Sequence, residues 1–170
     1  MTTPAAIAAI EADLHDRHRI ITSEVQVAAG EVLRITHPAN ADDLITEADY
    51  VQDERLPYWA DIWPSAVVLA RFLRGLRGAG RTLLELGCGA GVVASAAARA
   101  GFAVTATDYY DDAPRFARVN AWHNAQVDIA AQHADWTAWP VELTDFDLVV
   151  ASDVLYEMRY ADLVARTLAT

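Results

Sequence analysis

The sequence predicts an α/β fold with a doubly wound, mostly parallel sheet. Short apolar runs alternate with helical patterns from residue 82 onward, which is typical of βαβ units. One run leads into glycines at alternate positions, Gly87, Gly89 and Gly91, and Asp108 ends the next run. The crossovers of such folds are right-handed, and their ligands bind in a crevice at the carboxyl ends of the strands.

Composition sets the class of protein before any motif is considered. The chain has 170 residues, 54% of them hydrophobic and 22% charged, which suits one folded domain. A formal net charge of -11 and the lack of a basic patch disfavour nucleic acid as a partner. Cys88 is the single cysteine, so no internal disulfide forms and a cytoplasmic location is expected. No apolar run approaches a membrane span, and the histidines show no metal-ligand spacing, so we expect no membrane association and no metal.

The first 55 residues are expected to form an extension ahead of the domain at residues 56–170. Apolar residues recur at three- and four-residue steps over residues 4–19, which predicts a helix. Alternating apolar character at residues 24–28 and 31–36, on either side of Gly30, predicts a β-hairpin. A polar, acidic loop is expected at residues 37–53.

Helix and strand patterns follow in regular order. Pro64 suits the first turn of a helix that ends near Leu76, and Gly75 favours that end. We expect its inward face to carry Val67, Val68, Phe72 and Leu76. Further strands are predicted at residues 82–86, 103–107, 127–132 and 146–151, and further helices at residues 92–100, 112–124 and 160–168.

The glycine loop after Leu86 is the most informative segment. Glycine allows a ligand to approach the backbone closely, and the helix behind it offers unpaired N–H groups. The carboxylate of S-adenosylmethionine (SAM) suits such a position. A dinucleotide fold has Gly-x-Gly-x-x-Gly, whereas this chain has Gly-x-Gly-x-Gly preceded by Glu85. No phosphate-binding Gly-x-x-x-x-Gly-Lys motif occurs, which excludes a P-loop NTPase.

That spacing resembles the class I SAM-dependent methyltransferases, which have a Rossmann-like fold. Three further segments are similar to one branch of them: Pro57-Tyr58-Trp59-Ala60 with Trp63-Pro64, Asn120-Ala121-Trp122-His123-Asn124, and Ser152-Asp153-Val154-Leu155-Tyr156. The branch is that of the seven-strand lysine methyltransferases, typified by the METTL21-type enzymes and the electron-transfer-flavoprotein β-subunit lysine methyltransferases. The resemblance covers residues 56–168.

The resemblance implies a set of site residues. Asp108 would hold the ribose hydroxyls, Asp135 and Trp136 would flank the adenine, and Asp153 and Tyr156 would face the acceptor as the catalytic residues. The remaining cofactor-binding residues are expected to be Trp63, Glu85, Gly87, Cys88, Gly89, Gly91 and Ser152. The Asn/Asp-Pro-Pro-Tyr motif of adenine and glutamine N-methyltransferases is absent, which weighs against base methylation.

The expected function is therefore methyl transfer from SAM to an amine, with S-adenosylhomocysteine as the product. A lysine side chain of a protein is the favoured acceptor. A small-molecule N- or O-methyltransferase and a non-catalytic SAM-binding module remain open alternatives, whereas the glycine spacing argues against a nicotinamide oxidoreductase.

The strand count departs from the resembled fold. That fold has seven strands, and only four parallel ones are predicted here, as in a sheet truncated after the fourth strand. Residues 146–151 would then form an apolar edge. A chain that continues beyond residue 170 is the favoured explanation, because apolar parallel strands normally have neighbours on both sides. A second copy of the chain pairing at this edge is the alternative.

Overall fold

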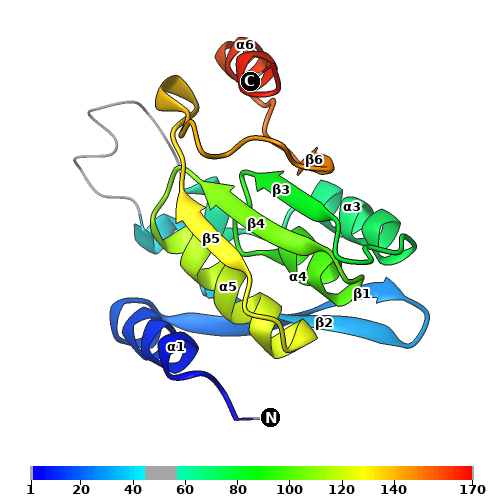
Figure 1. Ribbon diagram of the computed structural model, residues 1–170. Coiled ribbons are helices and arrows are strands. Elements are labelled where there is room, and N and C mark those ends of the chain that lie inside the picture. The colour runs from blue at the N-terminus through cyan, green and yellow to red at the C-terminus, as the bar shows by residue number, and fades with distance from the viewer. Residues whose placement is uncertain (1, 45–56, 170) are drawn as a thin grey trace.

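The structure is a computed structural model that describes residues 2–44 and 57–169 (Figure 1). The expected boundary between residues 55 and 56 and the second half of the predicted loop at 37–53 lie outside the described residues. In the first half of that loop, strand β2 continues to Pro38 and a 3-10 helix, η1, spans Ala41–Leu44.

A four-stranded parallel sheet forms the centre of the molecule, in the order β5-β4-β3-β6. Its strands are β3 (Thr82–Leu86), β4 (Ala103–Asp108), β5 (Ala130–His133) and β6 (Leu148–Ala151). This confirms the predicted parallel sheet of α/β type. The chain moves outward from β3 through β4 to β5 and then returns to the other side of β3, so the strand order reverses at β3. Crevices for ligands occur at such reversals.

Two strands are shorter than the sequence predicts. We expected the third parallel strand over residues 127–132, but β5 begins only at Ala130. The preceding helix ends in a left-handed Gln126, and Val127 is 39% exposed, so residues 127–129 lead the chain back to the sheet. The fourth strand begins at Leu148 rather than Phe146.

Helices cover both faces of the sheet (Figure 1). Helices α4 (Val92–Arg99) and α5 (Asp112–Ala125) lie on one face, and α6 (Met158–Thr167) lies on the other. Side chains alternate between faces along β3, so Leu84 and Leu86 join the cluster with Val164 of α6. Leu83 joins the larger cluster built with α4 and α5. The doubly wound arrangement therefore follows from a strand that is apolar on both sides.

The N-terminal segment forms a further layer beyond α4 and α5 (Figure 1). Helix α1 (Ala5–Arg17) and the antiparallel strands β1 (Ile20–Ala28) and β2 (Glu31–Pro38) confirm the predicted helix and hairpin. Ile7 and Leu14 of α1 are fully buried in the same cluster as Leu83. Residues 2–44 thus share the core of the rest of the described chain.

Helix α3 (Pro64–Arg74) presents a different face from the one predicted. Val68 and Phe72 are 63% and 62% exposed, so their expected inward placement is wrong. Ala70 and Leu73 are buried instead, and Ala70 packs with the hairpin residues Val25 and Leu33. A small residue at this position lets the helix approach the hairpin closely, and apolar periodicity alone did not reveal that preference for a small side chain.

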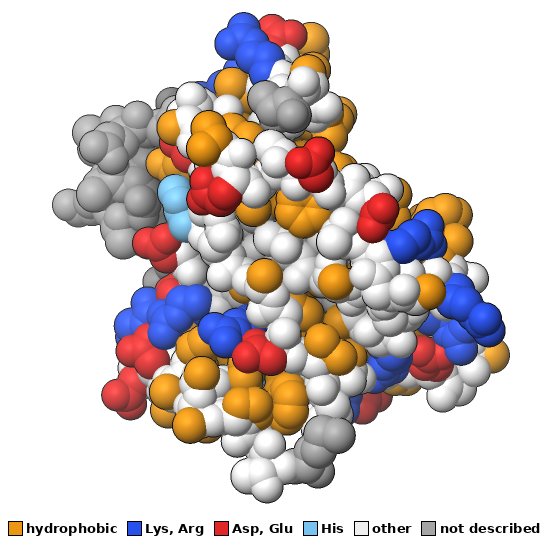
Figure 2. All heavy atoms as spheres, viewed as in Figure 1, with side chains coloured by type: hydrophobic (Ala, Val, Ile, Leu, Met, Phe, Trp, Pro, Cys, Tyr) orange, Lys and Arg blue, Asp and Glu red, His pale blue; other side chains and the backbone are white. Residues whose placement is uncertain are grey.

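Opposite charges are interspersed on the surface. On the face shown in Figure 2, basic side chains lie beside acidic ones. Near α1 and α5, Arg17 and Arg115 pair with Asp112, and Arg118 pairs with Asp128. Within residues 2–44 and 57–169, no helix is long and apolar enough to cross a lipid bilayer.

The start of α4 depends on a glycine, which gives a first prediction. Gly91 has a φ of 82°, and a Cβ atom there would lie 2.4 Å from the Cα of Ala117 in α5. Gly91→Ala should therefore lose about 1–2 kcal/mol of stability to left-handed strain and about 1–3 kcal/mol more to overpacking. Urea denaturation monitored by tryptophan fluorescence measures the loss.

Gly30 provides the matched control for this substitution. Its φ is 74°, but a Cβ atom there would meet nothing within 4 Å. Gly30→Ala should therefore show only the strain, about 1–2 kcal/mol. Equal losses in the two variants would contradict the packing argument.

Candidate active site

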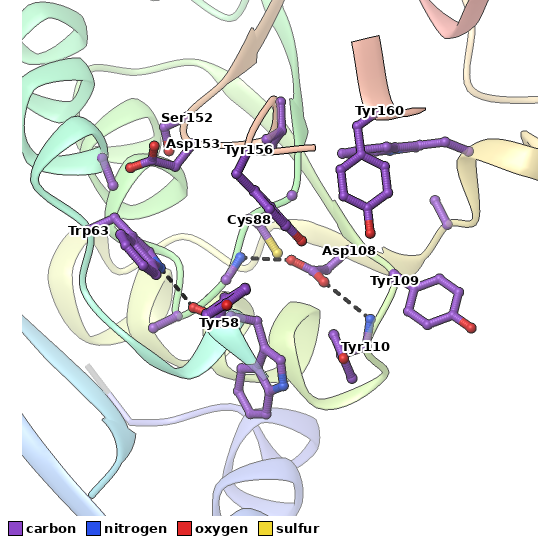
Figure 3. Close-up of a pocket in the computed structure, with 18 of the residues that line it drawn as sticks. Tyr58, Trp63, Cys88, Asp108, Tyr109, Tyr110, Ser152, Asp153, Tyr156 and Tyr160 are labelled. Carbon is purple, nitrogen blue, oxygen red and sulfur yellow. Dashed lines mark hydrogen bonds between the residues drawn. The ribbon is translucent and has the colours of Figure 1, made fainter. Parts of the chain in front are cut away.

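A pocket opens at the carboxyl ends of β3, β4 and β6, where the strand order reverses (Figure 3). It encloses about 1000 Å³, including the space at its open mouth. The glycine loop after β3 forms its floor, and segments 58–66, 134–137 and 152–163 contribute to its walls. Most of the predicted site residues come together here: Trp63, Gly87, Cys88, Gly89, Asp108, Asp135, Trp136, Ser152, Asp153 and Tyr156.

Asp108 ends β4 and lies in the middle of this pocket. Its Oδ2 accepts a hydrogen bond from the N–H of Gly89 at 2.9 Å, and its Oδ1 accepts one from the N–H of Tyr110 at 3.1 Å (Figure 3). Burial raises the pKa of this carboxyl group, while the backbone donors lower it. The carboxylate is thus fixed between the glycine loop and the turn after β4.

The glycine loop presents its backbone to the pocket through residues 87–90. The N–H of Cys88 donates to the carbonyl oxygen of Thr107 at 2.9 Å, which ties the loop to β4. Burial raises the pKa of the Cys88 thiol well above its usual range, and the nearby charges of Asp108 and Glu85 add to the effect. A thiol that stays protonated is a poor nucleophile, so Cys88 acts here as a small buried residue.

Glu85 and Gly91 are the two predicted site residues that do not line the pocket. Glu85 points to the other side of β3, where it is 1% exposed and accepts a hydrogen bond from the backbone of Ala94 in α4. Burial raises its pKa well above the usual range. Gly91 packs against Ala117 of α5 rather than facing a ligand. Successive side chains of β3 point to opposite faces of the sheet, and Glu85 lies on the face that α4 covers. The glycine motif does not reveal which face of the strand Glu85 takes.

Aromatic rings line the mouth of the pocket in a continuous series of edge-to-face contacts. Trp63 contacts Tyr58 with ring centroids 5.8 Å apart, and Tyr58 contacts Tyr156 at 5.5 Å. Tyr156 in turn contacts Tyr160 at 5.1 Å, and Tyr160 contacts Trp136 at 5.8 Å. The indole N–H of Trp63 also donates to the carbonyl oxygen of Tyr58 at 2.8 Å. Burial raises the pKa of Tyr156, so its hydroxyl stays protonated.

Asp135 and Trp136 lie on the wall after β5. Asp135 caps the 3-10 helix η3 (Trp136–Ala138), because its side chain accepts hydrogen bonds from the N–H and hydroxyl of Thr137, both at 2.8 Å. Trp136 is half-buried beside Gly87 and Tyr160. A flat ring and a carboxylate therefore stand next to each other at this end of the pocket.

Asp153 follows β6 and has an unusual backbone. Its φ is 55°, in the left-handed region that non-glycine residues rarely adopt. The hydroxyl of Ser65 in α3 donates to its carboxylate at 2.5 Å. The side chain of Asp153 lies at the rim of the pocket (Figure 3). Strained backbone of this kind clusters at functional sites.

Several lining residues were missed in the sequence: Tyr58, Asp61, Tyr109, Tyr110 and Tyr160. Tyr109 and Tyr110 directly follow Asp108, so their position after a strand end was an available signal. Tyr58 and Asp61 lie in the aromatic segment that carries Trp63. Tyr160 gave no local signal, because an aromatic residue in the first turn of a helix such as α6 is equally typical of a core position.

The ionisable side chains of the pocket lining include several acidic groups and no basic ones. The lining contains the carboxyl groups of Asp61, Asp108, Asp135 and Asp153, and none of the lining residues is Lys, Arg or His. Aromatic faces and carboxylates both attract cations. Such a lining disfavours the pyrophosphate of a dinucleotide and favours a positively charged ligand. Among the residues that the structure describes, no group of His, Cys, Asp and Glu could hold a metal ion.

The sequence of residues 40–170 matches the family described as lysine methyltransferase. The chain belongs to this family. The match includes the glycine loop, Asp108 and the segment with Asp153 and Tyr156, so the described pocket lies within the part of the chain that defines membership.

Several curated lysine methyltransferases are similar to more than half of this chain. A protein N-lysine methyltransferase METTL21A from Xenopus tropicalis is 31% identical over 62% of this chain and 52% of its own length. Electron transfer flavoprotein beta subunit lysine methyltransferases from Danio rerio and Xenopus laevis are 33% and 35% identical, over 62% and 64% of this chain and 42% and 44% of theirs. The chain thus spans about half the length of these curated relatives.

A buried histidine supports the pocket wall from behind. The ring of His37 in β2 is 8% exposed and makes hydrogen bonds to the carbonyl oxygen of Ala60 at 3.1 Å and the hydroxyl of Ser23 at 2.9 Å. Burial lowers the pKa of His37, so the folded protein holds the neutral ring. Ala60 follows Trp59, which lines the pocket.

This lowered pKa gives a prediction for the pH dependence of stability. A histidine with a pKa below its unfolded value near 6.5 stabilises the fold fully above that value, and the contribution decreases as pH falls. The free energy of unfolding of the wild type should therefore exceed that of His37→Gln most at about pH 7.5, and the difference should shrink towards about pH 5.5. Urea titrations at both pH values measure it. A difference that grows at acidic pH would contradict the neutral assignment.

Proposed function

We propose that this chain is the catalytic part of a SAM-dependent methyltransferase that transfers a methyl group to an amine, with a lysine side chain of a protein as the acceptor. The observation that carries the proposal is the pocket at the strand-order reversal, where the fixed carboxylate of Asp108 and the glycine loop meet a lining of aromatic and acidic side chains. Membership in the lysine methyltransferase family supports it.

The pocket fits the chemical parts of SAM. Asp108 would accept hydrogen bonds from the ribose hydroxyls, as an acid at this strand end does in related folds. The backbone of residues 87–89 would hold the methionyl part near the N-terminus of α4. Asp135 and Trp136 would bind the adenine, and Trp63 and Ser152 would line the cofactor. Bound in this way, SAM supplies a methyl group activated by its sulfonium.

The acceptor end of the pocket would lie at Asp153 and Tyr156. A lysine ammonium must lose a proton before its nitrogen can attack, and the Asp153 carboxylate, fixed by Ser65, would orient the amine and offset its charge. The rings of Tyr58 and Tyr156 would close the mouth around the aliphatic part of the side chain. Alignment of donor and acceptor would lower the barrier further, because the leaving group is already activated.

A protein acceptor is favoured by the charge of the chain. The net charge is -11, and the pocket mouth adds Asp61 and Asp153, so a basic segment of another protein is attracted. The same negative charge disfavours binding of nucleic acid. Arg17, Arg115 and Arg118 are in addition paired with aspartates, which makes these arginines less available to phosphate groups. We also propose a cytoplasmic location, because the single cysteine suits a reducing compartment.

Strand β6 forms an edge of the described sheet and carries Val149, which is 36% exposed. The family relation and the length of the relatives favour further strands at this edge, supplied by a longer chain. A second copy of this chain pairing along β6 is the alternative, and the solution mass of the protein distinguishes the two.

Binding of S-adenosylhomocysteine tests the cofactor proposal. Wild-type protein should bind it in calorimetry, and Asp108→Asn should weaken binding about 10- to 100-fold, because a hydrogen bond to a charged group contributes about 1.5–3 kcal/mol. Asp128→Asn is the matched control, since Asp128 pairs with Arg118 on the surface away from the pocket. Full binding by Asp108→Asn, or no binding by the wild type, would overturn the proposal.

Transfer of a labelled methyl group tests the acceptor proposal. The chain contains no lysine, so label found on lysine after incubation with SAM and a cell lysate must lie on another protein. Asp153→Ala should reduce this transfer at least about 10-fold while leaving S-adenosylhomocysteine affinity within about twofold. Label confined to small molecules would favour the small-molecule alternative, and an equal loss of affinity and transfer would reject the acceptor role of Asp153.

A further inference from the structure

Two asparagines on α5 bind the outer edge of the N-terminal hairpin in the same way. Asn120 accepts a hydrogen bond from the N–H of Thr36 at 2.8 Å and donates to its carbonyl oxygen at 2.7 Å. One helical turn later, Asn124 accepts from the N–H of Arg34 and donates to its carbonyl oxygen, both at 2.9 Å. Each side-chain amide thus takes the place of a neighbouring strand at the edge of β2.

The two asparagines differ in their third hydrogen bond. Asn120 also donates to the carbonyl oxygen of Ala90 at 2.8 Å, within the glycine loop that lines the pocket. Asn124 donates instead to the carbonyl oxygen of Asn120 at 2.8 Å, inside its own helix. Asn120 is fully buried, so its hydrogen bond to Ala90 is shielded from water.

We propose that Asn120 is a positioning residue of the cofactor site, which couples the N-terminal hairpin to the glycine loop through its side-chain amide. This inference rests on the proposed function for its effect on SAM. The side-chain amide of Asn120 holds the carbonyl group of Ala90, just before α4 begins. The backbone of Thr36 in the hairpin fixes the orientation of that amide. The strand that carries Thr36 also carries His37, whose ring is hydrogen-bonded to the carbonyl oxygen of Ala60, next to the lining residue Trp59.

The coupling makes the hairpin part of the cofactor site although none of its residues lines the pocket. A loop that must present backbone groups to a ligand loses less freedom on binding if it is already fixed. The hairpin supplies this preorganisation through Asn120, whereas Asn124 contributes only to docking. Removal of either side-chain amide should destabilise the protein, but only removal of the Asn120 amide should weaken binding of the ligand.

The test compares Asn120→Ala with Asn124→Ala as a matched control, because each variant removes three side-chain hydrogen bonds. Calorimetry below the unfolding temperature should show about a 10-fold weaker affinity for S-adenosylhomocysteine in Asn120→Ala and a change within about twofold in Asn124→Ala. Equal effects in both variants, or unchanged affinity in Asn120→Ala, would overturn the inference.

A second pair of variants changes only the hairpin, in case Asn120→Ala does not fold. Thr36→Pro removes the N–H that orients Asn120, and Arg34→Pro removes the one that orients Asn124, both at the outer edge of β2 where proline is tolerated. Thr36→Pro should weaken the binding of S-adenosylhomocysteine several-fold more than Arg34→Pro does. Equal affinities in these two variants would again contradict the coupling.

Hydrogen exchange separates the coupling from the proposed function, since it needs no ligand. The N–H of Gly91 donates to the carbonyl oxygen of Cys88 at 2.9 Å, so its exchange reports on the closed loop. Exchange at Gly91 should be faster in Asn120→Ala than in Asn124→Ala. Wild-type protein that fails to bind S-adenosylhomocysteine would reject the proposed function, while unchanged exchange at Gly91 would reject the coupling.

Discussion

The site depends on one buried carboxylate held by backbone donors. Asp108 is 8% exposed and accepts hydrogen bonds from the N–H groups of Gly89 and Tyr110, which come from two different loops. A buried charge without such donors would be strongly destabilising. The two loops must therefore take fixed conformations around the carboxylate, and these conformations in turn shape the floor of the pocket.

Close packing behind the loop makes this conformation possible. Helix α4 consists largely of small residues, and Gly91 lets its first turn lie against Ala117 of α5. Asn120 follows Ala117 by one turn and binds the loop carbonyl of Ala90. Helix α5 thus supports the loop twice, once by close van der Waals contact and once by a hydrogen bond, and the hairpin orients the amide that makes the second contact.

The sequence predicts those parts of the fold and site that depend on local pattern. The parallel strands, the glycine loop and Asp108 follow from apolar runs and glycine spacing, and the family resemblance located Asp153 and Tyr156 at the same pocket. The pairing of Asn120 with Thr36 joins residues far apart in the chain through an amide, and it leaves no periodic signal. The exposed Phe72 shows the same limit, because an apolar pattern does not say which neighbour a helix meets.

Glu85 and Asp108 illustrate how two nearby acids take different roles. Burial raises both pKa values, but Asp108 has several backbone donors, whereas Glu85 has the N–H of Ala94 and an Oε2 with no partner among the described residues. The charge of Asp108 raises the pKa of Glu85 further. The backbone donors therefore offset part of the effect of burial at Asp108, whereas little offsets it at Glu85. Glu85 thus belongs to the packing beneath the glycine loop, and Asp108 is the acid of this pair that a ligand in the pocket would meet.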